Sequence, residues 1–262
     1  MPELPEVEIY KQFLDATSLH QRVERVEVRN AYILKETSAR ELVRRLKGRV
    51  FDSSRRHGKH LFVRTDGEFW LRLHFGMTGS LQYFEDTEAV PRHARVVFLF
   101  ANNHRLAFDD QRQFGEIGLV PDVDEFLSKH ALGPDALKID LLEFRNVLRK
   151  RRGAVKSVLL NQRIIAGIGN LYADEILFRL RIHPATEVSR LGDKALTKLF
   201  QVTHQVLRKA IAAKAQSNQV PNSWLLSHRE KGAKCPRCRR VLGSVTIGGR
   251  TTWFCSYCQR AR

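Results

Sequence analysis

Cys235-Pro236-Arg237-Cys238 and, sixteen residues further on, Cys255-Ser256-Tyr257-Cys258 contain all four cysteines of this 262-residue chain. Two C-x2-C pairs at this spacing are typical of structural zinc, because each pair forms a short chelating turn and four thiolates complete a tetrahedral shell. Two disulfides are the alternative, but they fit an intracellular chain poorly. We therefore expect one structural zinc ion, bound by Cys235, Cys238, Cys255 and Cys258.

The residues between the two pairs predict a β-hairpin, because 241–247 and 250–254 flank the turn Gly248-Gly249. Arg250 follows these glycines and should sit at the hairpin tip. A zinc-stiffened hairpin that projects one arginine could grip a phosphate. The alternative is an ordinary exposed turn arginine.

The residues before this finger predict a helical region, with helices at 141–150, 154–160, 170–180 and 194–214. Leu132-Gly133-Pro134-Asp135 reads as the linker that precedes it. Gly167 and Gly169 should form a turn before the Asn170 helix, whose amides would suit a phosphate, with Lys156 adding a charge. A tight helical corner that simply needs glycine is the alternative.

The charge distribution supports an anionic partner for this second half. The net charge is +17, yet residues 1–134 carry 20 Lys+Arg and 20 Asp+Glu, whereas residues 135–262 carry 25 and 8. A polyanion explains this asymmetry, and a ribosomal-type or nonspecific basic domain is the alternative. The longest apolar run, residues 96–101, is far too short to span a bilayer. With no apolar signal core at the N-terminus, we expect a soluble, intracellular protein.

The first half predicts one N-terminal helix, residues 5–16, followed by short strands with one helix, 39–46, among them. The strands are expected at residues 22–28, 49–53, 60–64, 69–75, 80–84, 95–100 and 105–109. The predicted fold class is thus α+β, with an N-terminal helix on a β-sandwich or barrel and then helices and the finger. The expected domains are 1–131, 132–230 and 231–262.

Three glycine-flanked segments of the first half carry candidate functional side chains. Lys59 lies in Arg55-Arg56-His57-Gly58-Lys59-His60, which could also be a solvated basic turn. Met77 lies in 75–79, and Arg112 and Phe114 lie in 112–115. Large residues in such loops could wedge into a base stack, although Met and Phe more often belong to a core.

The N-terminus, Met1-Pro2-Glu3, suggests covalent chemistry if Met1 is removed. The terminal secondary amine of Pro2, with a pKa of about 8, could attack an aldehyde-like sugar carbon and give an iminium ion of fixed charge, a strong electron sink. Glu3 and Glu6 lie within one turn and could act as acid or base. The alternative is that Pro5, Glu6 and Glu8 simply start a helix well.

Together these motifs resemble those of the formamidopyrimidine-DNA glycosylase and endonuclease VIII family of base-excision repair enzymes. The likeness spans the chain in the family's order: residues 1–8, 56–59, 74–79, 111–115, 132–134 and 167–175, then the zinc hairpin. The trio Met77, Arg112 and Phe114 is similar to the formamidopyrimidine branch.

The resemblance implies a helix–two-turns–helix domain with a zinc finger, and damaged double-stranded DNA bound between the domains. It implies that Pro2 forms the Schiff base with Glu3 as proton donor, Glu6 and Lys59 assisting, and β,δ-elimination nicking the strand. It also implies that His93 contacts DNA and that Arg112, Lys156, Asn170 and Arg250 hold the DNA backbone. Met77, Arg112 and Phe114 would fill the gap left by the extruded base. We expect a monomer in the cytoplasm, with the nucleoid if the source is bacterial, that needs no cofactor besides zinc.

One segment departs from the family pattern. Members that cleave 8-oxoguanine have a longer, glycine-containing loop before the finger, and Gln216–Lys234 shows no counterpart of it. The resemblance then favours ring-opened purines, hydantoins, oxidised pyrimidines or abasic sites over 8-oxoguanine. The competing function is a zinc-containing protein that binds DNA damage on the same scaffold without catalysis.

Overall fold

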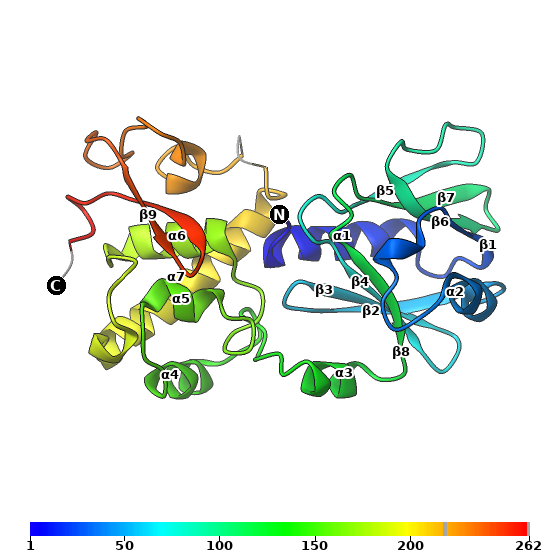
Figure 1. Ribbon diagram of the computed structural model, residues 1–262, viewed down its shortest axis with the longest axis horizontal. Coiled ribbons are helices and arrows are strands. Elements are labelled where there is room, and N and C mark those ends of the chain that lie inside the picture. The colour runs from blue at the N-terminus through cyan, green and yellow to red at the C-terminus, as the bar shows by residue number, and fades with distance from the viewer. Residues whose placement is uncertain (217–218, 261–262) are drawn as a thin grey trace. The chain divides into compact units, whose positions relative to one another are not determined.

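The computed structural model describes residues 1–216 and 219–260, and the chain divides into two compact units, Met1–His130 and Ala131–Arg262 (Figure 1). Residues 217 and 218, inside the expected short segment Gln216–Lys234, lie outside the described residues. So do residues 261 and 262, at the end of the expected finger domain 231–262. The predicted α+β class is confirmed in both units.

The first unit is built on two four-stranded antiparallel sheets, in the orders β1-β6-β7-β5 and β2-β3-β4-β8. Apolar side chains from both sheets form one shared core, which includes Phe51, Phe98 and Phe108. The elements are α1 (Leu4–Thr17), β1 (Val23–Val28), η1 (Ala31–Ile33), α2 (Ala39–Leu46), β2 (Phe51–His57), β3 (His60–Thr65), β4 (Trp70–His74), β5 (Ser80–Glu85), β6 (Ala94–Phe100), β7 (His104–Asp109), β8 (Glu116–Val120) and α3 (Val123–Lys129).

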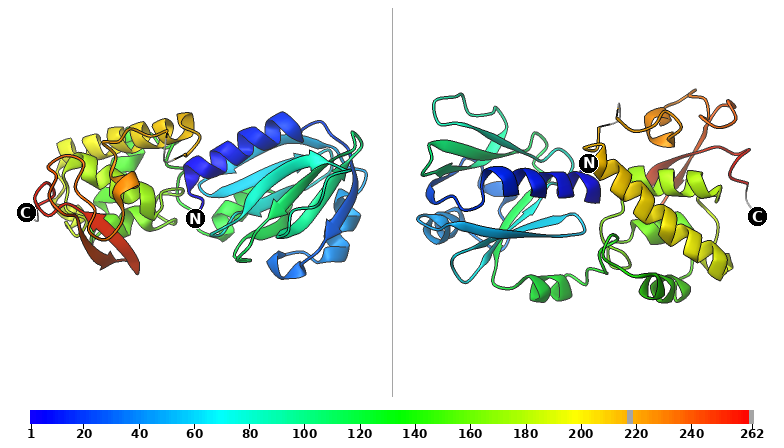
Figure 2. Two further views of the ribbon diagram at one scale, coloured as in Figure 1. Left: turned by 90° about the horizontal axis from the view of Figure 1, so that it is seen from above. Right: turned by 180° about the vertical axis from the view of Figure 1, so that it is seen from behind.

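Helix α1 lies along the sandwich and packs against both sheets, through β2 and β3 of one and β5 of the other (Figure 2). Val7 and Leu14, two turns apart, are completely buried, and Tyr10 and Phe13 pack beside them. This apolar stripe explains why the helix predicted at 5–16 forms where it does. Its N-terminus is thereby held against a rigid scaffold.

Three elements of this unit were not predicted, namely the short 3-10 helix η1, strand β8 and helix α3, and one strand was misplaced. Strand β8 contains Gly118, which weakens a strand pattern. A side chain there would come within 2.6 Å of the Lys35 carbonyl, so the close approach requires glycine. Helix α3 has only seven residues, too few to give a periodic signal, although its N-cap, Asp122, was readable. Strand β2 runs to His57, so residues 55–57 belong to a strand and not to a turn.

The second unit is organised around α6, which contacts α5, α7, η3 and β10. All residues from Tyr172 to Phe178 are buried, as expected of a helix surrounded on all sides. The elements are α4 (Leu141–Arg149), α5 (Val155–Leu160), α6 (Asn170–Leu180), η2 (Val188–Arg190), α7 (Asp193–Ala212), η3 (Leu225–His228), β9 (Gly243–Ile247) and β10 (Arg250–Phe254). Within residues 1–216 and 219–260, no helix combines the length and apolar character that crossing a membrane requires.

Candidate functional site

The N-terminus of α1 is closed by a reciprocal pair of hydrogen bonds between Glu3 and Glu6. The Glu3 carboxylate accepts from the Glu6 amide, and the Glu3 amide donates to Glu6 Oε2 at 2.8 Å. This is a capping box, and it satisfies amide donors that a helix start leaves unpaired. Glu3 is only 1% exposed, whereas Pro2 is half-buried and Met1 is exposed. The capping box therefore holds a carboxylate rigidly beside Pro2.

Lys59 sits in a two-residue turn that a partly buried ion pair ties to α1. Arg56, 4% exposed, donates from Nε to Glu8 Oε2 of α1 at 2.6 Å and from one terminal nitrogen to the Gly58 carbonyl at 3.2 Å. Gly58 has φ +54°, as expected of glycine at the first position of a II′ hairpin turn. Arg56 thus joins the β2–β3 turn, which carries Lys59, to helix α1, which begins just after Pro2.

The two glycine-flanked loops lie side by side and present their large side chains to solvent. Met77 is 40% and Phe114 is 54% exposed, so neither belongs to the core. Arg112 lies over the Phe114 ring, 5.0 Å from its centre. The structure therefore brings Met77, Arg112 and Phe114 together. The His93 carbonyl accepts from the Asp110 amide, which places His93 beside the second loop.

Lys156 occupies a completely buried position, which differs from the exposed charge expected of a phosphate contact. Its ammonium donates to Asn170 Oδ1 at 2.7 Å and to Thr252 Oγ1 at 2.6 Å, and it lies 2.6 Å from Asp174 Oδ1. Asn170 in turn donates to the Thr251 carbonyl. In this arrangement Lys156 fixes Asn170 against strand β10 and is not displayed at the surface.

The turn before α6 is organised by Gln162, a residue that the sequence did not single out. Its amide nitrogen donates to the carbonyls of Leu160 and Ile168, and its oxygen accepts from the Gly167 amide. Gly167 has φ +115°, a conformation that L side chains rarely adopt. The predicted glycine turn is therefore a tight corner that also carries Asn170 at the start of α6.

Arg250 lies at the tip of the β9–β10 hairpin, as predicted. Gly248 and Gly249 both have positive φ, at +58° and +69°, as in a type I′ turn. Arg250 pairs with Ile247 across this turn, and it is exposed. The hairpin is anchored by the Trp253 amide, which donates to Asp174 Oδ2 of α6.

The four cysteines meet in one cluster, with all four sulfur atoms within 4.8 Å of one another. Four sulfur donors at this separation fit a tetrahedral zinc ion and leave no open coordination position. The Arg240 amide lowers the pKa of the Cys238 thiol to about 7, whereas burial raises the pKa of Cys255 and raises that of Cys258 to about 12. The predicted structural zinc site is confirmed by this donor set.

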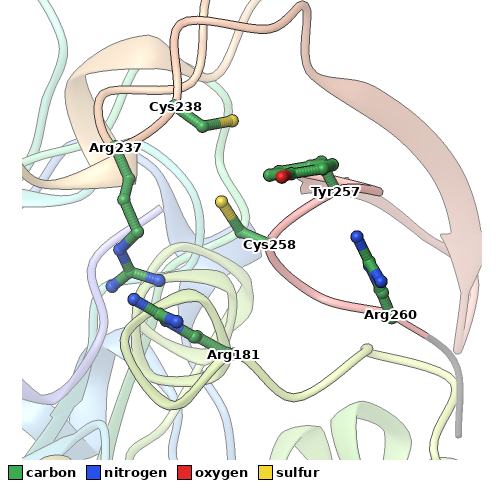
Figure 3. Close-up of a pocket in the computed structure, with 6 residues that line it drawn as sticks. All are labelled: Arg181, Arg237, Cys238, Tyr257, Cys258 and Arg260. Atoms are coloured by element: carbon green, nitrogen blue, oxygen red, sulfur yellow. The ribbon is translucent and has the colours of Figure 1, made fainter.

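A cavity of about 450 Å³ opens beside the zinc cysteines (Figure 3). Its walls combine three arginines with two of the ligand cysteines and one aromatic ring: Arg181, Arg237, Cys238, Tyr257, Cys258 and Arg260. Four thiolates around Zn²⁺ carry a formal charge of about −2. The guanidinium groups around Cys238 and Cys258 offset this charge, so the surroundings of the cysteines also fit the metal.

Two acidic residues of α6 hold the finger and the segment before it. Asp174 accepts from Arg229 and from the Trp253 amide, and Glu175 accepts from the Leu226 amide and Arg179. Both carboxylates are completely buried, and burial raises the pKa of Glu175. Carboxylates inside an otherwise apolar helix were the available sequence signal for this role.

The chain matches three consecutive families. These are the formamidopyrimidine-DNA glycosylase N-terminal domain at residues 1–117, the H2TH domain of the same enzymes at 132–222, and a zinc finger found in FPG and IleRS at 232–261. The formamidopyrimidine-DNA glycosylase of Streptococcus pneumoniae is 33% identical over 275 aligned positions, covering 99% of both chains. That alignment is longer than this chain, so the relative has residues without a counterpart here.

Solved structures of the Lactococcus lactis enzyme share the fold. A complex of that enzyme with DNA containing N7-benzyl-Fapy-dG has a TM-score of 0.89 at 29% identity, covering 99% of this chain and 100% of the other. A complex with DNA containing an abasic site gives the same TM-score, identity and coverage.

Proposed function

This chain belongs to the formamidopyrimidine-DNA glycosylase family, and on that premise we propose that it excises damaged bases through a Schiff base on Pro2 and then nicks the strand. It is a base-excision repair DNA glycosylase with a structural zinc finger. The observation that carries the Pro2 assignment is the capping box. This box buries Glu3 directly after a half-buried Pro2 at the end of a rigid helix.

Removal of Met1 frees the Pro2 nitrogen as a secondary amine. That nitrogen attacks the anomeric carbon of the damaged nucleotide, the glycosidic bond breaks, and the base leaves with the bonding electron pair and takes up a proton. Ring opening of the sugar, with Glu3 as proton donor, gives a cationic iminium ion. The iminium acidifies the adjacent sugar hydrogens, so β-elimination expels the 3′ phosphate and δ-elimination then expels the 5′ phosphate.

The other candidate residues bind and orient the DNA in this proposal. Arg250 grips a phosphate from the hairpin tip, and Asn170 does so from the start of α6, positioned by Lys156. Lys59, fixed to α1 through Arg56, contacts a phosphate near the reacting sugar and assists proton transfer together with Glu6. Arg112 completes the backbone contacts, and His93 also contacts the DNA. Met77, Arg112 and Phe114 fill the space from which the damaged base is extruded.

Borohydride trapping on abasic-site DNA tests the proposal. The wild-type chain with Met1 removed should form a covalent adduct that carries the DNA on the N-terminal peptide. Pro2→Gly, or an N-terminal tag that is not cleaved, should greatly reduce the adduct while zinc content and DNA affinity persist. If the wild type binds abasic-site DNA but gives no adduct, the chain is the non-catalytic damage-binding protein.

The proposed lesion preference rests on the segment before the finger. The described part of this segment, from residue 219 to Lys234, includes η3, and Trp224 and Leu225 are completely buried there. Residues with this packing are held away from solvent, which supports a site without a long capping loop. We expect ring-opened guanine, hydantoins and abasic sites to be processed faster than 8-oxoguanine. A panel of duplexes that each carry one lesion measures this order.

The partner in this proposal is damaged double-stranded DNA, and the protein acts on it as a monomer. Because the curated relatives are bacterial enzymes, the cytoplasm and the nucleoid are the proposed location. Sedimentation with and without a lesion-bearing duplex distinguishes a 1:1 complex from a dimeric one.

A further inference from the structure

The two loops that carry Met77, Arg112 and Phe114 each connect one sheet of the first unit to the other, at the same edge. Residues 75–79 lead from β4 to β5, and residues 110–115 lead from β7 to β8. Since β4 pairs with β8 in one sheet and β5 pairs with β7 in the other, the two loops must run together. Their ends are in register, with His74 opposite Glu116 and Ser80 opposite Asp109.

One buried carboxylate joins these loops. Asp110 is completely buried, and its Oδ1 accepts a short hydrogen bond from the Thr78 hydroxyl of the other loop. Its Oδ2 accepts from the Gly115 amide at 2.7 Å, which closes its own loop. The Thr78 oxygen accepts in addition from the Arg112 amide at 3.0 Å. The pair Thr78–Asp110, which we call the loop latch, therefore touches the backbone on both sides of Phe114.

The backbones of the two loops are also in direct contact, so neither loop can shift without displacing the other. A Cβ on Gly76 would lie 2.3 Å from the Phe114 carbonyl of the other loop. Within the second loop, a Cβ on Gly115 would lie 2.9 Å from the Asp110 side chain. Beneath the latch, Phe75 is buried and its ring lies 4.5 Å from that of Tyr10 on α1. The side chains of Met77, Arg112 and Phe114 thus project from loop backbone that is fixed by the Thr78–Asp110 hydrogen bonds and by the packing of Phe75 on α1.

We infer that the loop latch is a positioning device for base extrusion: it holds Met77, Arg112 and Phe114 as one rigid wedge. The inference rests on the proposed function. Extrusion of a base must be offset by groups that are already in place, because ordering a mobile loop at that moment would cost conformational entropy. An abasic nucleotide has no base to unstack and depends less on the wedge. The latch should therefore affect base excision more than strand cleavage at an abasic site.

The test compares two substrates in single-turnover experiments, a duplex with ring-opened guanine and the same duplex with an abasic site. Thr78→Val keeps the shape of the side chain but removes both hydroxyl contacts. We expect excision of the base to slow about tenfold or more, with abasic-site cleavage changed less than threefold. Thr78→Ser, which retains the hydroxyl, should restore excision. Asp110→Asn keeps one oxygen acceptor for the Gly115 amide and turns its NH2 toward Thr78 Oγ1, so it should slow excision less than Thr78→Val does, again without an equal loss at the abasic site.

Thr65→Val is the matched control. Thr65 is buried, whereas Thr78 is partly exposed. The Thr65 hydroxyl also makes two turn contacts, to the Phe69 carbonyl and the Gly67 amide, but at the β3–β4 turn. In Thr65→Val, the rates of base excision and of abasic-site cleavage should fall by the same factor or stay unchanged. Equal losses on both substrates in Thr78→Val, or no loss, would overturn the latch. A wild type that cleaves neither substrate would instead overturn the proposed function.

Discussion

The Lys156 ammonium lies 2.6 Å from the Asp174 carboxylate, and neither side chain exposes any surface. The contact is ionic more than directional, since Asp174 Oδ1 lacks a well-aligned hydrogen bond. Asp174 Oδ2 meanwhile accepts from Arg229 and from the Trp253 amide. One buried pair thereby connects α5, α6, the segment before the finger and the finger itself.

Lys156→Met should destabilise the second unit by about 3 kcal/mol, because removal of one partner from a buried ion pair leaves a charge only partly compensated. Urea unfolding of the zinc-loaded protein, followed by circular dichroism, measures the change. Lys198→Met on the exposed face of α7 is the control and should stay within about 0.5 kcal/mol of wild type. A Lys156→Met protein as stable as this control would show that the pair contributes nothing.

Zinc removal should unfold the finger and weaken DNA binding, because four thiolates without a cation cannot hold the two cysteine turns together. Cys238→Ala should have the same effect, while Ser256→Ala, between two ligands, should retain zinc and affinity. Trp253, half-buried on β10, reports the finger by its fluorescence. If the affinity for DNA is unchanged after the zinc is chelated, the finger does not contribute to DNA binding.

Stability should fall as the pH drops from about 6.5 towards 4. His60 and His74 face each other with ring centres 4.8 Å apart, near Arg72, His57 and His130. Burial lowers the pKa of His74 to about 4 and that of His60 well below its usual range. The unfolded chain therefore binds protons first, and the stability present above pH 6.5 is lost through this window, by up to about 3 kcal/mol for His74.

His60→Phe should make this pH dependence shallower, since one partly buried imidazole no longer titrates and a ring of similar shape packs against Phe62 and Phe126. Thermal melts between pH 4 and 7.5 provide the measurement. His20→Asn, at an exposed position with positive φ that asparagine tolerates, is the control. Parallel pH curves for wild type and His60→Phe would contradict the assignment.

DNA affinity should depend steeply on salt. If four or five cationic contacts form, the logarithm of affinity falls against the logarithm of salt concentration with a slope of roughly −4. Arg250→Gln should reduce the magnitude of this slope by about 1, because one phosphate contact is lost. Arg44→Gln, which removes an exposed charge on α2 already paired with Glu41, should leave the slope unchanged. A wild-type slope near zero would exclude the electrostatic clamp.

Local chemistry explains which elements were predictable. Helix α2 was predicted at its observed bounds because Ser38 caps it and Leu42 and Leu46 mark its apolar face. The finger was predictable because metal ligands must recur at chelating intervals. Strand β8 was not predictable, because its Gly118 lowers the strand propensity. Glycine is required there by the close approach of the Lys35 carbonyl.

The sequence by itself determined the α+β class, the zinc ligands and the exposed hairpin arginine, because each rests on local periodicity, turn residues or ligand spacing. The role of Pro2, Glu3 and Glu6 is a prediction from the sequence. Only the tertiary structure decided that Lys156 is buried against Asp174, that Arg56 ties Lys59 to α1, and that Thr78 meets Asp110. These pairs are separated by 18 to 48 positions along the chain. Their contacts arise from sheet pairing and helix packing, which bring distant residues together, and no local sequence pattern predicts such contacts.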